Sequence, residues 1–141
     1  MTAIKSDFYT LKGYKIKENK KITEAMEDYI EMIYRENKNN KITIKEISNC
    51  LNVKPSSASK MAKRLKELSL IDFEKYGEIS LTQEGIDLGN YLMKRHNILK
   101  KFFKYINKED FLLEQVEKIE HFIDYKTIKN INEYLKRSNH Y

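Results

Sequence analysis

The chain has 141 residues, of which 34% are charged and 40% are apolar, and its formal net charge is +6. This length and balance are typical of one compact domain, or of a small domain with a helical attachment. The sequence has no apolar run near the roughly 18 residues that a membrane span needs, and no signal-peptide pattern. The single cysteine, Cys50, offers no intramolecular disulfide, and we expect it in the core. We therefore expect a cytoplasmic protein without a membrane partner.

Charge is distributed unevenly along the chain. Residues 41–68 contain seven Lys or Arg and two Glu, a balance of +5. Residues 109–124 contain one Lys and six acids, a balance of −5. The first segment should attract phosphate, and the second gathers oxygen atoms that are able to bind a cation.

The chain is predicted to be mainly α-helical, because Pro and Gly are rare and Lys, Glu, Ile and Leu are common. Residues 1–21 are rich in lysine with interspersed aromatic residues. We expect them to form a basic and aromatic arm outside the core, which either follows DNA or is a disordered tail. Thr23 is the predicted N-cap of the first helix, and Thr43 is that of a second, short helix.

The next elements complete a recognisable order. Pro55 opens a third helix, and a β-hairpin follows over residues 70–81. Thr82 then caps a long helix, and two further helices are predicted over residues 109–123 and 125–137. Helix, short helix, turn, helix and hairpin are typical of a winged helix-turn-helix, which we assign to residues 22–82.

The third helix and the hairpin carry residues suited to DNA. Small hydroxyls at a helix N-terminus can approach a phosphate in the major groove, and nearby lysines neutralise the phosphate backbone. A lysine near the tip of the hairpin can reach an adjacent stretch of backbone. The alternative is an ordinary solvated basic face. The residues selected as DNA contacts are Ser56, Ser57, Lys60, Lys63, Arg64 and Lys75.

Acids and histidines on three predicted helices are candidate metal ligands, although each set has a simpler interpretation. Asp28 and Glu31 share one side of a helix, where solvated acids are common. His96 lies on an apolar stripe, where a core histidine is the ordinary meaning. A charged helix face opposite apolar residues holds the last three, Glu117, Glu120 and His121.

Four motifs, in the right order, give the chain a family resemblance. They are an opening helix at 26–34 (MEDYIEMIY), a recognition helix at 53–61 (VKPSSASKM), a wing at 74–77 (EKYG), and metal-binding segments at 95–97 (RHN) and 117–121 (EKIEH). These motifs resemble those of the diphtheria-toxin-repressor family, and of its manganese-responsive branch in particular. The resemblance extends from about residue 22 to residue 137.

This resemblance implies a metal-dependent transcriptional repressor that binds operator DNA as a homodimer and controls metal uptake genes. It implies two ions per subunit, Mn2+ or else Fe2+, and makes residues 83–141 an α-helical dimerisation and metal-binding domain. It assigns one ion to Asp28, Glu117, Glu120 and His121. It assigns the other to Glu31 and His96, with Glu117 and Glu120 shared. We also expect the apolar stripe Leu88, Leu92, Leu99 and Phe103 to contribute to the dimer.

Departures from the iron-type members of that family favour the manganese-responsive branch. Iron-type members place Met and Cys where this chain has Asp28 and Glu117, an acid where it has Lys100, and a further SH3-like domain. We therefore expect the short form, which is a binding protein and not an enzyme. The alternatives are an iron-responsive repressor, a winged-helix regulator that senses no metal, and a metallohydrolase, for which the chain offers no candidate base outside the ligand set.

Overall fold

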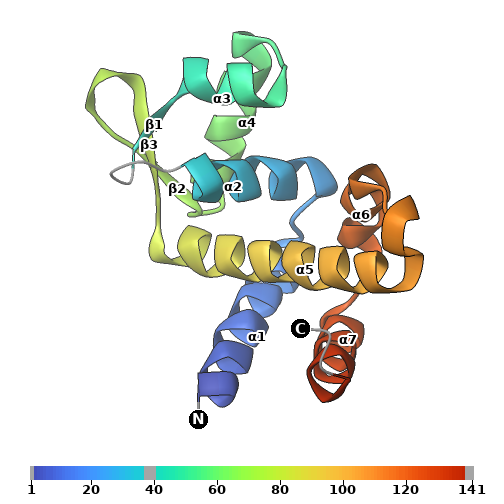
Figure 1. Ribbon diagram of the computed structural model, residues 1–141. Helices are drawn as coiled ribbons and strands as arrows, with labels where there is room; N and C mark the ends of the chain where they lie inside the picture. Colours follow the sequence, from blue (N-terminus) through green and yellow to red (C-terminus); the bar gives the residue numbers. More distant parts are fainter. Residues whose placement is uncertain (1, 37–40, 139–141) are drawn as a thin grey trace.

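The computed structural model describes residues 2–36 and 41–138, and it is mainly α-helical, as predicted. A long helix, α5, crosses the molecule, with the helix-turn-helix and a small sheet on one side of it and α1 and α7 on the other (Figure 1). No helix of these residues is long and apolar enough to span a membrane. The α-helices are α1 (Thr2–Lys20), α2 (Glu24–Glu36), α3 (Ile44–Leu51), α4 (Pro55–Glu67), α5 (Gln83–Asn107), α6 (Leu113–Ile119) and α7 (Tyr125–Arg137).

Helices α2, α3 and α4 form the predicted helix-turn-helix. Thr43 caps α3 with a capping box: its hydroxyl accepts a hydrogen bond from the Glu46 amide, and the Glu46 carboxylate accepts one from the Thr43 amide. Asn52 ends α3 in the left-handed conformation, and Pro55 begins α4 at a position where its missing N–H costs nothing. These local signals explain why the sequence located both helices.

The predicted hairpin is present as the wing. Strand β3 (Glu78–Leu81) pairs antiparallel with β2 (Ile71–Phe73) and, on its other edge, with the short β1 (Ile42–Thr43). The connecting turn, η2 (Lys75–Gly77), holds Tyr76 and Gly77 at positive φ, which brings the chain back on itself. The winged helix-turn-helix prediction is confirmed.

Helix α5 links two apolar cores. Its first half contributes Leu88 and Leu92 to the core under the helix-turn-helix. Its second half contributes Ile98 and Leu99 to a smaller core with α6 and α7. The helix predicted over residues 109–123 is instead divided into η3 (Lys108–Asp110), α6 and η4 (Glu120–Phe122). Any rotation between the two parts of the molecule must therefore bend or repack α5.

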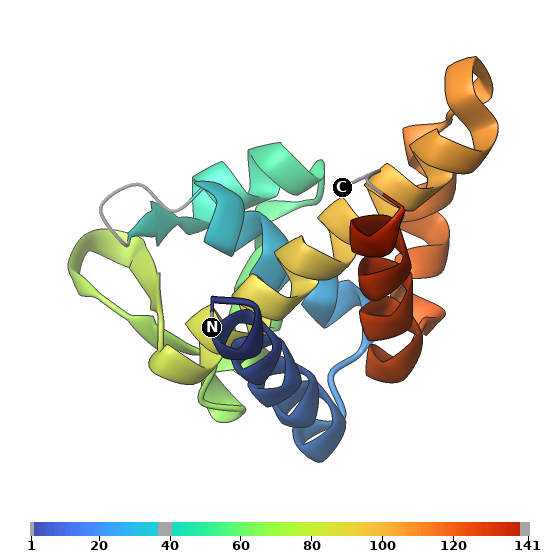
Figure 2. The same ribbon diagram turned by 60° about the horizontal axis from the view of Figure 1, so that its bottom comes forward.

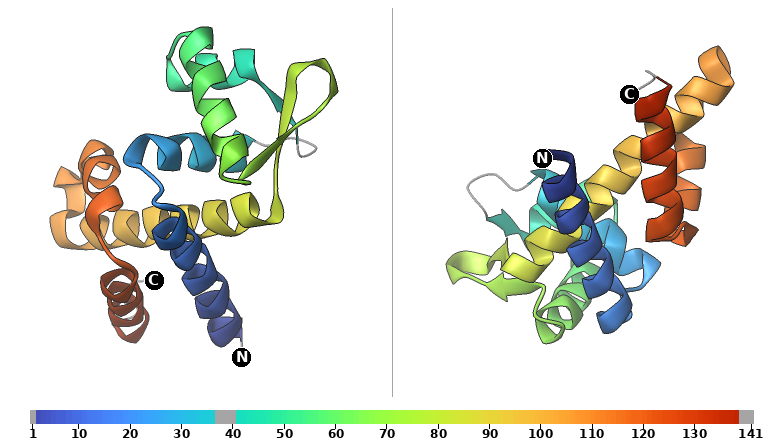
Figure 3. Two further views of the ribbon diagram at one scale, coloured as in Figure 1. Left: turned by 180° about the vertical axis from the view of Figure 1, so that it is seen from behind. Right: turned by 90° about the horizontal axis from the view of Figure 1, so that it is seen from below.

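The N-terminal segment differs from the expected arm. Residues 2–20 form α1, which crosses α5 at close range on the side away from α3 and α4 (Figures 2 and 3). Gly13 permits this approach, because a Cβ atom there would lie 2.4 Å from the Asp87 carbonyl oxygen and 2.6 Å from the Tyr91 Cβ. The Tyr14 ring packs against Tyr91 and Tyr125, each at a centroid distance of 5.7 Å.

Ion pairs explain how a lysine-rich segment becomes part of the packed structure. Lys12 pairs with Asp87 at 3.3 Å, and Lys20 pairs with Glu84 at 3.0 Å, both partners lying on α5. The acids of α5 therefore match the basic face of α1. The sequence of residues 1–21 alone does not indicate these partners, because they lie more than sixty positions away along the chain.

We predict that Gly13→Val loosens α1 from α5. The new side chain meets the α5 backbone, and overpacking of this kind typically costs about 1–3 kcal/mol. Its gain in helix propensity over glycine is below about 1 kcal/mol and does not offset that cost. Denaturant unfolding measures the loss, with Asn19→Val at an exposed α1 position as the control. Equal stability of the two variants would contradict the close packing of α1.

Candidate metal centre

A cavity of about 500 Å³ lies between α2, α3, α5 and the α6–η4 segment. Carboxylates and imidazoles from both halves of the molecule line it. Cys50 also lines it and is exposed, so the expectation of a core cysteine was wrong. Ile47 and Leu51 take the inner face of α3 instead. The cavity includes all six of the predicted ligands, namely Asp28, Glu31, His96, Glu117, Glu120 and His121.

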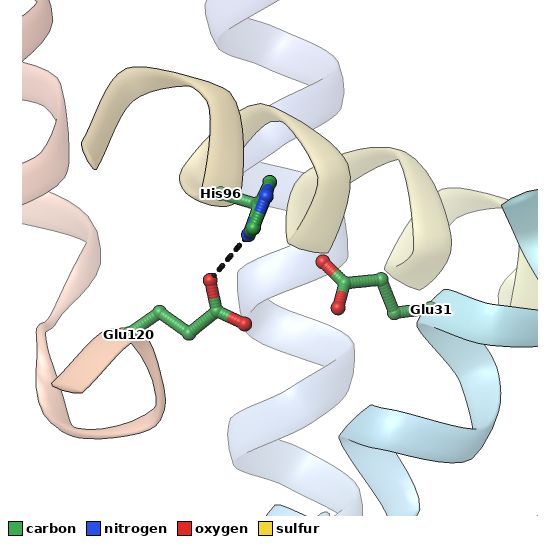
Figure 4. A group of neighbouring side chains, drawn as sticks. All are labelled: Glu31, His96 and Glu120. Carbon is green, nitrogen blue, oxygen red and sulfur yellow. Dashed lines mark hydrogen bonds and ion pairs between the residues drawn. The ribbon is translucent and has the colours of Figure 1, made fainter. Parts of the chain in front are cut away.

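Three of these side chains converge on one point. Glu31, His96 and Glu120 each offer one ligand atom, and these atoms lie within 4.8 Å of one another. They come from α2, α5 and η4, and they point toward a common space (Figure 4). His96 Nδ1 lies 2.8 Å from Glu120 Oε2. The buried Glu31 Oε1 has no hydrogen-bond partner among the residues that the structure describes.

The electrostatics of this group favour a cation. Burial and the neighbouring charge of Glu120 raise the pKa of Glu31 to about 7. The hydrogen bond with Glu120 raises the pKa of His96, against the effect of burial. The group contains two carboxylates and one imidazole, and one carboxylate oxygen is buried without a partner among the described residues. Such a set suits a divalent ion that takes oxygen and nitrogen ligands. The residues present therefore fit a metal.

A second pair lies beside the first group. His121 Nε2 is 3.2 Å from Asp28 Oδ1, and the Asp28 side chain is half exposed. Burial alone lowers the pKa of His121, but hydrogen bonds with Asp28 and Glu27 outweigh it and raise the pKa to about 9. Glu117 lines the same cavity from α6, where it is exposed.

The sequence analysis missed Glu27, the buried acid that supports this site. It is 1% exposed on α2, and its Oε1 lies 2.7 Å from His121 Nδ1. Arg95 donates to both of its oxygens, at 3.2 and 3.4 Å, and Lys17 pairs with Oε2 at 3.1 Å. Burial raises the pKa of Glu27, but His121, Arg95 and Lys17 together lower it below its usual value. The signal in the sequence was an acid one turn before the buried Ile30.

A carboxylate behind a histidine orients that histidine toward a metal. When the Nδ1 hydrogen is donated to Glu27, the Nε2 lone pair of His121 is free to face the cavity. The buried Arg95 compensates the Glu27 charge, so this carboxylate need not bind the ion itself. Glu27 is therefore placed to orient the His121 ring.

The residues predicted to contact DNA lie on α4 and in the wing. Figure 1 shows both elements on the side of α5 opposite α7. All of the selected side chains are exposed: Ser56, Ser57, Lys60, Lys63 and Arg64 on α4, and Lys75 in the wing. Their exposure leaves them available to a partner.

Two family models match the chain and together span nearly all of it beyond α1. Residues 21–79 match the iron dependent repressor, N-terminal DNA binding domain, and residues 82–140 match the iron dependent repressor, metal binding and dimerisation domain. The chain belongs to the iron-dependent repressor family. It is therefore a metal-dependent transcriptional repressor with a DNA-binding domain followed by a metal-binding and dimerisation domain.

Individual relatives agree with this membership. The chain is 37% identical over 114 residues to the HTH-type transcriptional regulator MntR of Oceanobacillus iheyensis, covering 79% of this chain and 77% of the relative. It is 36% identical over 111 residues to MntR of Lysinibacillus sphaericus, covering 77% of this chain and 80% of that one. Among solved structures, ScaR with bound Zn2+ superposes with a TM-score of 0.68 at 27% identity. That match covers 78% of this chain and 53% of the ScaR chain, so this chain spans about half its length.

We predict that Glu31→Gln stabilises the metal-free protein while it weakens metal binding. The substitution removes a buried carboxylate that faces another carboxylate, and relief of such a group is worth about 1–3 kcal/mol. Thermal unfolding at pH 8 in a chelator should show the gain, and Glu114→Gln, a paired and exposed acid on α6, should show none. A loss of stability in Glu31→Gln would contradict an unfavourable interaction between Glu31 and Glu120 in the metal-free protein.

Proposed function

We propose that this chain is a manganese-activated repressor that binds operator DNA as a homodimer and controls metal uptake genes. The observation that carries the proposal is the convergence of Glu31 from the DNA-binding domain with His96 and Glu120 from the metal-binding domain. Two ions per subunit would use the six cavity-lining ligands. One group contains Glu31, His96 and Glu120, and the other contains Asp28 and His121, with Glu117 available between them.

The cavity suggests how metal controls DNA binding. When bound, a divalent ion would supply the positive charge that holds carboxylates from α2 and η4 together. The ligands on α2 would then fix this helix against α5 and η4. Because α2 belongs to the same domain as α4, fixing α2 fixes the direction in which the recognition helix points. The ion acts as an activator only if it binds this arrangement more tightly than the others.

The donor set supports manganese. The six residues offer carboxylate and imidazole groups and no sulfur, and hard oxygen ligands suit Mn2+. Cys50 lines the same cavity, but it is not one of the six. Zn2+ prefers four ligands and would fill the two groups less completely. Similar proteins include those named MntR and the manganese regulator SloR, which superposes with a TM-score of 0.67 at 25% identity.

Most of the stripe that the sequence suggested is unavailable as a dimer surface. Leu88, Leu92 and Leu99 are fully buried within the subunit, whereas Phe103 is only partly buried. Large apolar side chains are instead exposed around the end of α5 and on α6, η4 and α7. Contact with a second copy of the chain would bury these exposed side chains, which are Ile106, Leu112, Leu113, Phe122 and Tyr134.

We predict that Glu120→Ala abolishes Mn2+-dependent DNA binding. Glu120 joins the Glu31 group to the η4 segment, so its loss should separate the two domains' ligands. Binding to a genomic fragment library, with and without Mn2+, identifies the operator for the wild-type protein and then measures the variant. Glu114→Ala, an exposed α6 acid at the edge of the cavity, is the control and should retain the metal response. Mn2+-dependent binding by Glu120→Ala would show that the ligand assignment is wrong.

We predict that the double variant Lys60→Ala, Arg64→Ala binds the operator more weakly and with a smaller salt dependence. Each removed cation reduces the slope of log affinity against log salt by about one unit for every phosphate it contacts. The control is Lys66→Ala, which removes an α4 lysine that already pairs with Asp72 at 2.8 Å. An unchanged affinity and slope in the double variant would contradict this placement of α4 on DNA.

A further inference from the structure

Helix α1 reaches the metal centre, although it lies outside the family match, which begins at residue 21. Lys17, near its C-terminal end, contacts Glu27 on α2 and the backbone of His121 in η4. The Lys17 side chain is only 14% exposed. A lysine at a terminal helix of this kind would ordinarily extend into solvent, so its burial requires partners.

The partners of Lys17 are the groups that support His121. Its Nζ lies 3.1 Å from Glu27 Oε2 and 3.4 Å from the backbone oxygen of His121. Glu27, through its other oxygen, holds His121 Nδ1 at 2.7 Å. One ammonium group thus fixes both the backbone of His121 and the carboxylate that orients its ring.

We infer that Lys17 is a positioning residue of the metal sensor and that docking of α1 and binding of Mn2+ stabilise each other. This inference rests on the proposed function. The link runs from Lys17 to Glu27 and from Glu27 to His121, whose Nε2 faces the cavity beside Asp28. Supporting partners of metal-bound histidines typically contribute 10- to 100-fold in metal affinity, by fixing the ring and its proton.

Simple electrostatics predicts the opposite sign. A cation close to the site repels a metal ion, so removal of Lys17 would tighten Mn2+ binding if its charge were all that mattered. Positioning predicts weaker binding, because Glu27 and the His121 backbone lose a shared donor. The direction of the change therefore decides between the two.

The coupling must also be reciprocal. If α1 docking raises the affinity for Mn2+, then Mn2+ must favour docking of α1 by the same factor. Amides of α1 should then exchange more slowly with solvent when Mn2+ is bound. This readout needs no substitution in the protein.

The test measures Mn2+ affinity by electron paramagnetic resonance of the free ion, for the full chain and three variants. Lys17→Met keeps the length of the side chain without its charge, and we expect about tenfold weaker Mn2+ binding. Lys17→Arg should restore most of the affinity. The matched control is Lys15→Met, the same substitution at an exposed position of α1, which should change affinity less than about twofold.

Hydrogen exchange of the wild-type chain, with and without Mn2+, completes the test. Slower exchange in α1 on addition of Mn2+ supports the coupling. Equal or tighter Mn2+ binding by Lys17→Met overturns the coupling. Hydrogen exchange in α1 that does not change on addition of Mn2+ overturns it too. The exchange result decides even if Lys17→Met fails to fold. If the wild-type chain binds no Mn2+, the proposed function fails instead.

Discussion

The buried carboxylate of Glu27 joins α1, α2, α5 and η4 beside the candidate metal centre. It accepts hydrogen bonds from Arg95 on α5 and Lys17 on α1, and it contacts the His121 ring in η4. Four segments from distant parts of the sequence therefore meet at one charge. A buried acid in this position is stable only because cations surround it, and removal of one partner would expose the others to an uncompensated charge.

The neighbouring cavity is organised in the opposite way. Glu31 and Glu120 face each other with one histidine between them, and one Glu31 oxygen has no partner among the described residues. Side chains that stabilised the metal-free fold would fill or neutralise this space. The protein instead keeps unfavourable charge at the proposed metal site, so under the proposed function the bound ion would contribute to the stability of the fold.

Helices α2 and α5 connect the candidate metal centre to the DNA-binding domain. Helix α2 packs against α3 and α5, places Asp28 and Glu31 at the cavity and buries Glu27 against Arg95 of α5. Helix α5 passes through both apolar cores. Under the proposed function, a change in how the ligands are held would change the angle between these elements, since close-packed cores shift as units.

The sequence by itself determined the local features. The Thr43 capping box, Pro55 and the turn at Gly77 are short-range signals, so the winged helix-turn-helix and its exposed basic residues could be predicted. The family motifs led to the six candidate ligands, all of which line one cavity. Only the tertiary structure decided that α1 packs on α5, that Cys50 is exposed, and that Glu27 is the buried support of His121. These features depend on partners such as Asp87, Tyr91 and Arg95, which are far away along the chain. Helical periodicity identifies a face, but it does not identify what covers that face.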